Sequence, residues 1–477
     1  MDKRYKQKNV STSGGKMNFI KIMWIAAAFL FVTACEPLDF SKTAKKQLSE
    51  VGRNLNLVPG AQVKKSGNPP TLRSMIQNAA ADVEMGLGFK AAVRSAVLSD
   101  PAVRSAEGEV QSQRSSIQVS KSMKEFLVSG TVYGGVEDVT DETTGLALVL
   151  SANRMVYDGG QLDNQITAQE YIAQAASYNL LTVKNERALA AVDAWLELER
   201  YTTLNELIGD RLEVLGPLIS QLERVAEAGI GDVSQVAAAQ RTVTLIRVTQ
   251  TDIAERLEQS KVSFVDIFGQ LPQTSKYEGA AISAAIPDDI TEDLVLRASA
   301  LQAEYAAYQA AVASLRSVEA KDNYNVGFES KFQRPLGGSE FDSDESLGFV
   351  VRKTLYSGNK LSSEISQAKA KVEAQAGKLK STYRQGKKAV ETSRQTIMSM
   401  DRAIEISSEN AKNSTEEIDY LRKQLIIGQS TLDSVLSAEA RLYDAQSKEI
   451  NFSTERKKAE ITLLATFGLL VDLFDLQ

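Results

Sequence analysis

A stretch of about 70 residues occurs twice in this chain, 199 positions apart, and it limits the possible folds more than any other feature. The first copy opens with Tyr157-Asp158-Gly159-Gly160 and closes at Gly229; the second opens with Tyr356-Ser357-Gly358-Asn359 and closes at Gly428. One uninterrupted helix of that length would reach ~105 Å. We therefore expect an elongated body of two repeats rather than two or three globular domains.

The long segments carry the pattern of packed helices. Apolar residues of the first copy step by three or four positions, as in a coiled-coil seam: Leu204, Ile208, Leu212, Leu215, Ile219 and Leu222. Gly216-Pro217 should kink or loosen this helix near its far end. Each long helix should then be followed by a returning helix, over 232–269 in the first copy and ending at Phe467-Gly468 in the second.

Each returning helix is only half as long as the long helix beside it. A further helix in each repeat should therefore cover the remaining distance to the strands. A helix over about 291–321 follows a break at 273–290 that is rich in Gly, Ala and Pro. The segment 85–122 takes the equivalent place before the first repeat, with a restart at Asp100-Pro101, an N-cap followed by proline at the first helical position. Both ends of the helical body should then meet about halfway along the long helices.

Four segments of about eleven residues predict strands that cross a membrane. They cover about 126–136, 146–156, 324–333 and 347–356. In the later pair, Tyr324, Val326 and Phe328 alternate with polar residues, which is typical of an apolar outer and a polar inner face. Four strands cannot close a barrel, and an open sheet edge in lipid leaves backbone groups unpaired, so the barrel would be shared between chains. The alternative is two surface hairpins of a soluble sheet.

The N-terminus has the pattern of an exported lipoprotein. Residues 1–34 combine basic residues with a short apolar run and predict a signal peptide, although a start at Met17 would make 1–16 a mis-assigned extension. Val32-Thr33-Ala34-Cys35 resembles the lipobox of bacterial lipoproteins, so we expect Cys35 to be lipidated after cleavage; the alternative is cleavage that leaves a free thiol. Residues 35–84 are a polar linker broken by Gly and Pro.

Composition argues against catalysis. The chain has no histidine and one cysteine, which removes the commonest general base, the commonest metal ligand and any internal disulfide. Its net charge of −6 gives no basic surface for nucleic acid. We expect neither an enzyme nor a cofactor.

The order of these elements resembles the TolC family of outer-membrane efflux and secretion channels. The resemblance rests on Tyr157-Asp158-Gly159-Gly160, on the segment from Gly428 to Ala438, and on the repeated register over about 85–470. It implies a mainly α fold with a transmembrane β part, in repeats 85–272 and 291–470 followed by a tail over 471–477. It further implies a homotrimer in the outer membrane of a Gram-negative bacterium, whose twelve-stranded barrel continues as a helical periplasmic tunnel.

The resemblance also implies sites and partners. A periplasmic adaptor would contact the glycine-turn tips, and an inner-membrane ABC or RND transporter would dock through that adaptor. The adaptor contacts are expected at Arg224, Gly229, Gly231, Asp232, Lys423 and Gly428. Asp433, Ser434 and Ser437 would lie at the tunnel entrance, where serines stand in place of an acidic ring and Asp433 is displaced by one position, so an acidic gate is not expected. Tyr157, Gly159, Tyr356 and Gly358 would form the strand-to-helix junctions.

Several functions fit this organisation. We favour the outer-membrane component of a type I secretion system, with the outer-membrane component of an RND-type multidrug efflux pump as the alternative. A periplasmic adaptor or a lipid-anchored coiled-coil scaffold is a third class, but an adaptor would have one helical hairpin rather than two tandem copies.

Overall fold

The computed structural model describes residues 72, 88–138, 143–227, 233–277, 279, 285–286, 292–336, 342–427 and 429–477. The chain divides into two units, Met1–Met75 and Ile76–Gln477, and the fold described below is that of the second. The predicted signal peptide, the lipid-anchor cysteine Cys35 and, apart from Leu72, the linker over 35–84 lie outside the described residues.

The two long helices and their returns follow the repeat. Helices α6 (Gln161–Glu227) and α11 (Lys360–Ile426) have 67 residues each, and the returns α7 (Val233–Phe268) and α12 (Leu432–Phe467) have 36 each. Every one of these bounds recurs 199 positions later, which confirms the predicted repeat. At 1.5 Å per residue the long helices reach ~100 Å and the returns ~54 Å.

Shorter helices occupy the rest of that length. Helices α4 (Phe89–Ser99) and α5 (Pro101–Ser122) precede the first repeat, and α9 (Glu292–Arg297), α10 (Ser299–Glu319) and the 3₁₀ turn η2 (Ala320–Asp322) precede the second. The predicted restart is confirmed, because the Asp100 carboxylate accepts a hydrogen bond from the Ala102 N–H at 2.7 Å. The short helix α13 (Leu470–Leu473) lies near the end of the chain.

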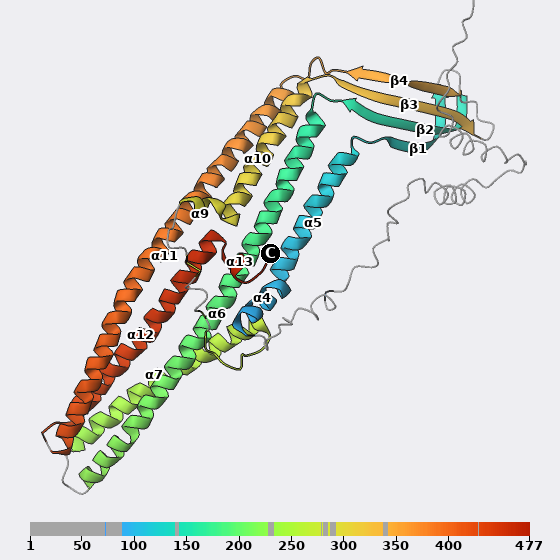
Figure 1. The fold of residues 1–477 in the computed structure, drawn as a ribbon. Coiled ribbons are helices and arrows are strands. Elements are labelled where there is room, and N and C mark those ends of the chain that lie inside the picture. Colours follow the sequence, from blue (N-terminus) through green and yellow to red (C-terminus); the bar gives the residue numbers. More distant parts are fainter. Residues whose placement is uncertain are drawn as a thin grey trace, which may run out of the picture. The chain divides into compact units, whose positions relative to one another are not determined.

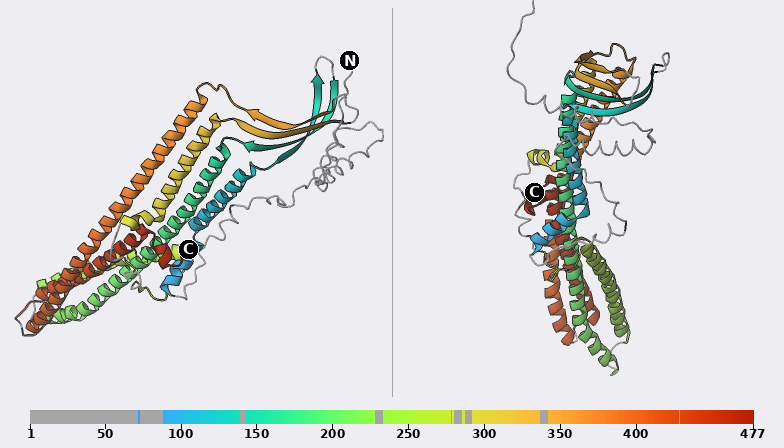
Figure 2. Two further views of the ribbon diagram at one scale, coloured as in Figure 1. Left: turned by 45° about the horizontal axis from the view of Figure 1, so that its top comes forward. Right: turned by 90° about the vertical axis from the view of Figure 1, so that its right-hand side faces the viewer.

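The helices of the second unit form two successive four-helix layers (Figures 1 and 2). Near the sheet, α6 packs between α5 and α10, and α10 packs on α11. Toward the tips, α7 and α12 both pack on α6, and α12 packs along α11. The order is thus α5-α6-α10-α11 in one layer and α7-α6-α12-α11 in the other, so α5, α7 and α11 lie at the layer ends.

The sheet lies beyond one end of the long helices (Figure 1). Strands β1 (Leu127–Asp138), β2 (Thr143–Tyr157), β3 (Asn325–Leu336) and β4 (Asp344–Arg352) pair in the order β1-β2-β3-β4, all antiparallel. The expected extension of the last strand to 356 is wrong. Its final pair is Arg352 with Asn325, the first residue of β3, so residues 353–356 have no strand opposite them.

A buried core ties the middle of the body together. Trp195 of α6 lies edge-on to Phe89 of α4 and to Phe264 and Phe268 of α7, with ring centroids 5.1, 5.2 and 5.6 Å away. Phe474, just after α13, lies 6.0 Å from Phe89. The two ends of the helical body therefore meet on the middle of α6, as predicted.

The predicted seam of α6 is also buried. Leu204, Ile208, Leu215 and Ile219 join one core cluster with residues of α7 and α12, and Leu212 packs against it. The side chain of Leu222 lies outside the described ones. Helix α6 continues through Pro217, so the proline interrupts the hydrogen-bond ladder of the helix without ending it.

Candidate functional site

The two faces of the sheet differ in chemistry. On one face Val326 pairs with Val351 and Phe328 with Phe349, and Leu347 follows on the same side. On the other face Lys331 bonds Asp344 across the strands at 3.1 Å, and Arg352 bonds Glu329. Strand side chains alternate in direction, so one face is fitted to lipid and the other to water.

The two edge strands of this sheet have one free side each. Strand β1 pairs only with β2, and β4 only with β3, within the described sheet. Backbone N–H and C=O groups without partners cost several kcal/mol each in lipid. A membrane-spanning sheet of this kind is complete only when each edge meets a further strand.

The first strand-to-helix junction is built by Asp158 and Gly159. The Asp158 carboxylate accepts hydrogen bonds from the N–H groups of Gly160 at 3.0 Å and Leu162 at 2.6 Å, which caps α6. Gly159 has a φ of 68°, and the Asn323 amide donates to its carbonyl at 3.3 Å. A side chain on Gly159 would meet Asn323 at 2.4 Å, so glycine is required both for its backbone angle and for this close approach.

The second strand-to-helix junction has the same left-handed glycine as the first but not its side-chain contacts. Gly358 has a φ of 61°, but nothing lies within 4 Å of the position of its absent Cβ. Tyr157 stacks near Tyr324 with centroids 5.1 Å apart, whereas Tyr356 is largely exposed. The two junction motifs are thus equivalent in chain path and different in packing.

The predicted contact residues at the tip are described only in part. Arg224 and Lys423 are exposed in the last turns of α6 and α11. Basic side chains at helix C-termini are favoured by the helix dipole, so the dipole alone accounts for charge at this place. Gly229, Gly231, Asp232 and Gly428 lie outside the described residues.

The predicted entrance residues lie in the first turn of α12 and just beyond it. Thr431 caps the helix by accepting a hydrogen bond from the Ser434 N–H at 3.3 Å, and the two hydroxyls lie 2.9 Å apart. Asp433 and Ser437 are exposed, while Ser434 is half-buried. The structure therefore brings Ser434 into the cap and leaves the carboxylate of Asp433 in solvent.

Sequence reasoning missed a set of charged contacts between α6 and α12. The Arg200 guanidinium donates to the Asn451 side chain at 2.7 Å and pairs with Glu455 at 3.1 Å. Toward the tip, the Arg211 guanidinium lies over the Tyr443 ring at 4.8 Å. The partners are more than 200 positions apart, so no local spacing could have revealed them.

A second set of missed contacts lies beside it. Lys458 pairs with Glu197, and Lys457 pairs with Glu199 at 3.0 Å. Asp193 lies in the same region; burial raises the pKa of its carboxyl, as do Glu197 and Glu455, against the opposing effect of Lys458. These ion pairs link α6 of the first repeat to α12 of the second.

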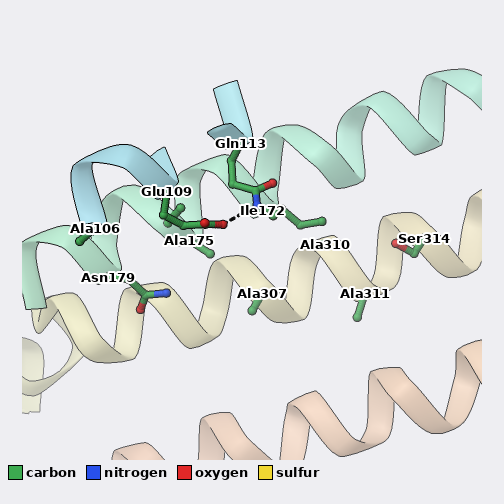
Figure 3. Close-up of a pocket in the computed structure, with 11 residues that line it drawn as sticks. Ala106, Glu109, Gln113, Ile172, Ala175, Asn179, Ala307, Ala310, Ala311 and Ser314 are labelled. Carbon is green, nitrogen blue, oxygen red and sulfur yellow. Dashed lines mark hydrogen bonds between the residues drawn. The ribbon is translucent and has the colours of Figure 1, made fainter. Parts of the chain in front are cut away.

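The described helices leave a groove between them. A groove of about 410 Å³ between α5, α6 and α10 is lined mostly by alanine side chains (Figure 3). Its one carboxylate, Glu109, already accepts a hydrogen bond from Gln113 at 2.6 Å. In the described part of the chain no group of three metal-ligating side chains occurs, and no helix there is long and apolar enough to cross a membrane.

Known proteins share this arrangement. Residues 291–469 match the family model described as outer membrane efflux protein. The outer membrane efflux protein BepC of Brucella suis biovar 1 (strain 1330) is 19% identical over 389 residues, covering 79% of this chain and 84% of the relative.

Solved structures of outer-membrane channels share the fold of this chain. The chain resembles CusC with a TM-score of 0.72 at 15% identity, over 86% of this chain and 99% of that one. It also resembles the open state of the MtrE outer membrane channel of Neisseria gonorrhoeae, with a TM-score of 0.67 at 12% identity over 79% and 88% of the two chains.

The second repeat is thus similar to outer membrane efflux proteins, and the fold of the chain is that of solved outer-membrane channels. The TolC-like fold expected from the sequence is thereby confirmed. Channels of this family are homotrimers that work with adaptor proteins and inner-membrane transporters, and they are not enzymes.

Proposed function

We propose that this chain forms one third of the wall of a passive export duct in the outer membrane, and that the duct serves a type I secretion system. The observation that supports a duct is the four-stranded sheet with two open edges, which is continued by helices of ~100 Å. Three copies would supply twelve strands, above the roughly eight that the smallest membrane barrels need. The apolar face would contact lipid and the polar face would line the passage.

The inner face should be polar but locally neutral. Lys331 and Glu329 are each paired with an opposite charge on β4. Paired charges attract neither a cationic nor an anionic substrate strongly. This supports a duct that accepts varied cargo and leaves selection to the inner-membrane transporter.

Cargo class is the finer part of the proposal. The junction motif Tyr157-Asp158-Gly159-Gly160 resembles secretion-type channels, and its Asp158 cap is fully formed. The second candidate is efflux of small molecules by an RND-type pump, which the printed name of BepC favours. In both, an adaptor would contact the tip near Arg224 and Lys423, with Gly229, Gly231, Asp232 and Gly428 at the turns.

Cys35 would tether the chain to outer-membrane lipid. The polar linker over 35–84 is long enough to join such an anchor to the helical body. Mass spectrometry of the purified chain tests this: a diacylglycerol-modified N-terminal cysteine is expected, and a free thiol or an unprocessed N-terminus would refute it.

Gene deletion tests the duct. In a strain without a second such channel, loss of the chain should remove particular proteins from the culture medium while the cells retain them or degrade them. Increased drug sensitivity with an unchanged set of secreted proteins would favour the efflux alternative. Unchanged secretion and unchanged drug tolerance would refute the duct itself.

A further inference from the structure

The half of α11 nearer the sheet carries a cluster of unpaired positive charge. Lys380, Arg384, Lys387 and Lys388 form this basic cluster, and no acidic residue occurs over 374–390. All four side chains are exposed, and none forms an ion pair within the described part of the chain, although other charged residues of α11 do. Like charges three or four positions apart on a helix repel one another, so an anionic partner would stabilise this face.

The same positions of the first repeat face the protein core. Their equivalents on α6, 199 positions earlier, are buried or packed against the central cluster of apolar side chains: Leu181, Asn185, Ala188 and Leu189. Helix α4 and the segment with α13 and Phe474 cover that side of α6. On α11 the four positions are charged and exposed, so this face of the second repeat has a different role.

The basic cluster lies on the side of α11 that faces outward in the proposed duct. Lys380 and Lys387 are three and four positions from Tyr383, so the three side chains are neighbours on the helix surface. The Tyr383 hydroxyl donates a hydrogen bond to Glu292 of α9. Helix α9 and the C-terminus lie on the same side of the helical layer (Figure 2, right). In a tube such added segments fit on the outside, where the circumference is larger.

A second copy of the chain does not provide the missing negative charge. The segment 470–476 covers α6, and its equivalent in the first repeat is 271–277. Residues 269–277 contain Lys276 and no acidic residue. If that segment of a neighbouring copy lay on α11, the basic cluster would remain without a counter-charge.

The face also lacks the features of a docking site for a folded protein. Protein interfaces are centred on aromatic and aliphatic anchors. In α11 and the turn before it, no large apolar side chain between Tyr356 and Met398 is exposed. Open positive charge without apolar anchors favours a flexible polyanion that is held by many weak contacts.

Lipid head groups are too far away to be that polyanion. Lys380 and Lys388 lie 20 and 28 positions after Lys360, the first residue of α11, which is ~30 to 42 Å along the helix. Salt screens the attraction between exposed charges beyond ~8 to 10 Å. The partner must therefore be a polymer of the periplasm rather than the membrane surface.

We propose that the basic cluster binds the free carboxylates of the peptidoglycan cell wall. Peptidoglycan is a periplasmic polymer whose peptide stems carry carboxylates at regular intervals. The proposal rests on the proposed duct, which places α11 in the periplasm with its α9 side outward. The contacts are ionic and reversible, and they set the height at which the cell wall surrounds the duct.

Co-sedimentation with purified peptidoglycan tests the proposal. The probe is peptidoglycan sacculi freed of bound protein by protease and then washed, mixed at low salt with the full chain in detergent. The chain should sediment with the sacculi and should be released as the NaCl concentration rises, because salt screens ionic contacts. Sacculi whose carboxylates have been converted to amides should bind little of the chain.

Charge reversal on two faces of α11 locates the contact. K380E/K387E should bind about tenfold more weakly, because two attractions become two repulsions. The matched control K371E/K378E makes the same change of charge at nearly the same height, about 160° to 180° around the helix, and should bind like the parent chain. All four lysines are exposed, so the Trp195 emission of both variants should be unchanged, which shows that they remain folded.

Several results would overturn the proposal: no sedimentation of the parent chain, equal losses for the two double variants, or undiminished binding to amidated sacculi. Binding to soluble polyglutamate without binding to sacculi would also overturn it and would indicate an acidic protein partner. Export separates this proposal from the duct. If the deletion strain loses export and K380E/K387E restores it, the duct stands whatever the sacculi show.

Discussion

Replacing Phe474 with alanine tests whether the segment after α13 holds the middle of the body together. The Phe474 side chain is buried against Phe89, within a cluster that also includes Trp195, Phe264 and Phe268. Removing a buried phenylalanine usually costs about 3–5 kcal/mol, from lost burial and from the cavity that remains. We expect a loss in that range for F474A.

The assay can use the fluorescence of Trp195. The sequence has two tryptophans, Trp24 and Trp195, and the first falls in the predicted signal peptide. In a chain that begins after residue 34, emission reports on the cluster alone. F474A should shift this emission to longer wavelength as water reaches the indole ring, and should lower the urea midpoint of unfolding.

Q477A is the matched control. Gln477 is exposed, three positions further along, and bonds only the Asp472 carboxylate at 2.7 Å; exposed changes of this kind usually alter stability by less than about 0.5 kcal/mol. A loss below about 1 kcal/mol for F474A, or equal losses for the two variants, would refute the view that the segment after α13 completes this core.

Three further predictions follow from the junctions, a buried carboxyl and the repeat. G159A and G358A should each lose about 1–2 kcal/mol of stability because alanine disfavours a left-handed backbone. G159A should lower the melting temperature further, because its Cβ would meet Asn323. Equal melting temperatures for the two variants would contradict this. Burial raises the pKa of Asp193, so the folded state is favoured at low pH and loses stability as pH rises through the folded pKa. The variant D193N cannot ionise and should therefore be more stable than the parent chain above about pH 4. A gain in stability that does not depend on pH would argue against this. Deleting 407–413 with 445–451 shortens one hairpin by ~10.5 Å and should abolish trimers on gels, whereas also deleting 208–214 and 246–252 should restore them; trimers from the first deletion would disprove the length match.

Element order and bounds could be predicted from the sequence because they depend on local chemistry and on the repeat. The cap at Asp100 and the left-handed glycines are local signals, and the offset of 199 lets each copy check the other. The end of β4 at Arg352 could not be predicted, since it depends on where β3 begins rather than on the residues of β4.

Contacts between segments that are far apart in the chain could not be predicted from the sequence. Local patterns do not show that Trp195 shares a core with Phe89 and Phe474, which lie 385 positions apart. The pairing of Glu197 with Lys458 is hidden in the same way. For the predicted tip residues, helix ends could be placed and their partners could not.

The meeting of Phe89 and Phe474 on α6 also has a consequence for biosynthesis. Residues 470–476 are made after every helix they contact, so α6 cannot complete its core until nearly all of the chain has been made. The buried Lys184 ammonium, which donates to the Leu476 carbonyl at 2.9 Å, stays without that acceptor until then. A chain stalled before residue 470 would thus expose the aromatic cluster and leave the Lys184 ammonium without its carbonyl acceptor.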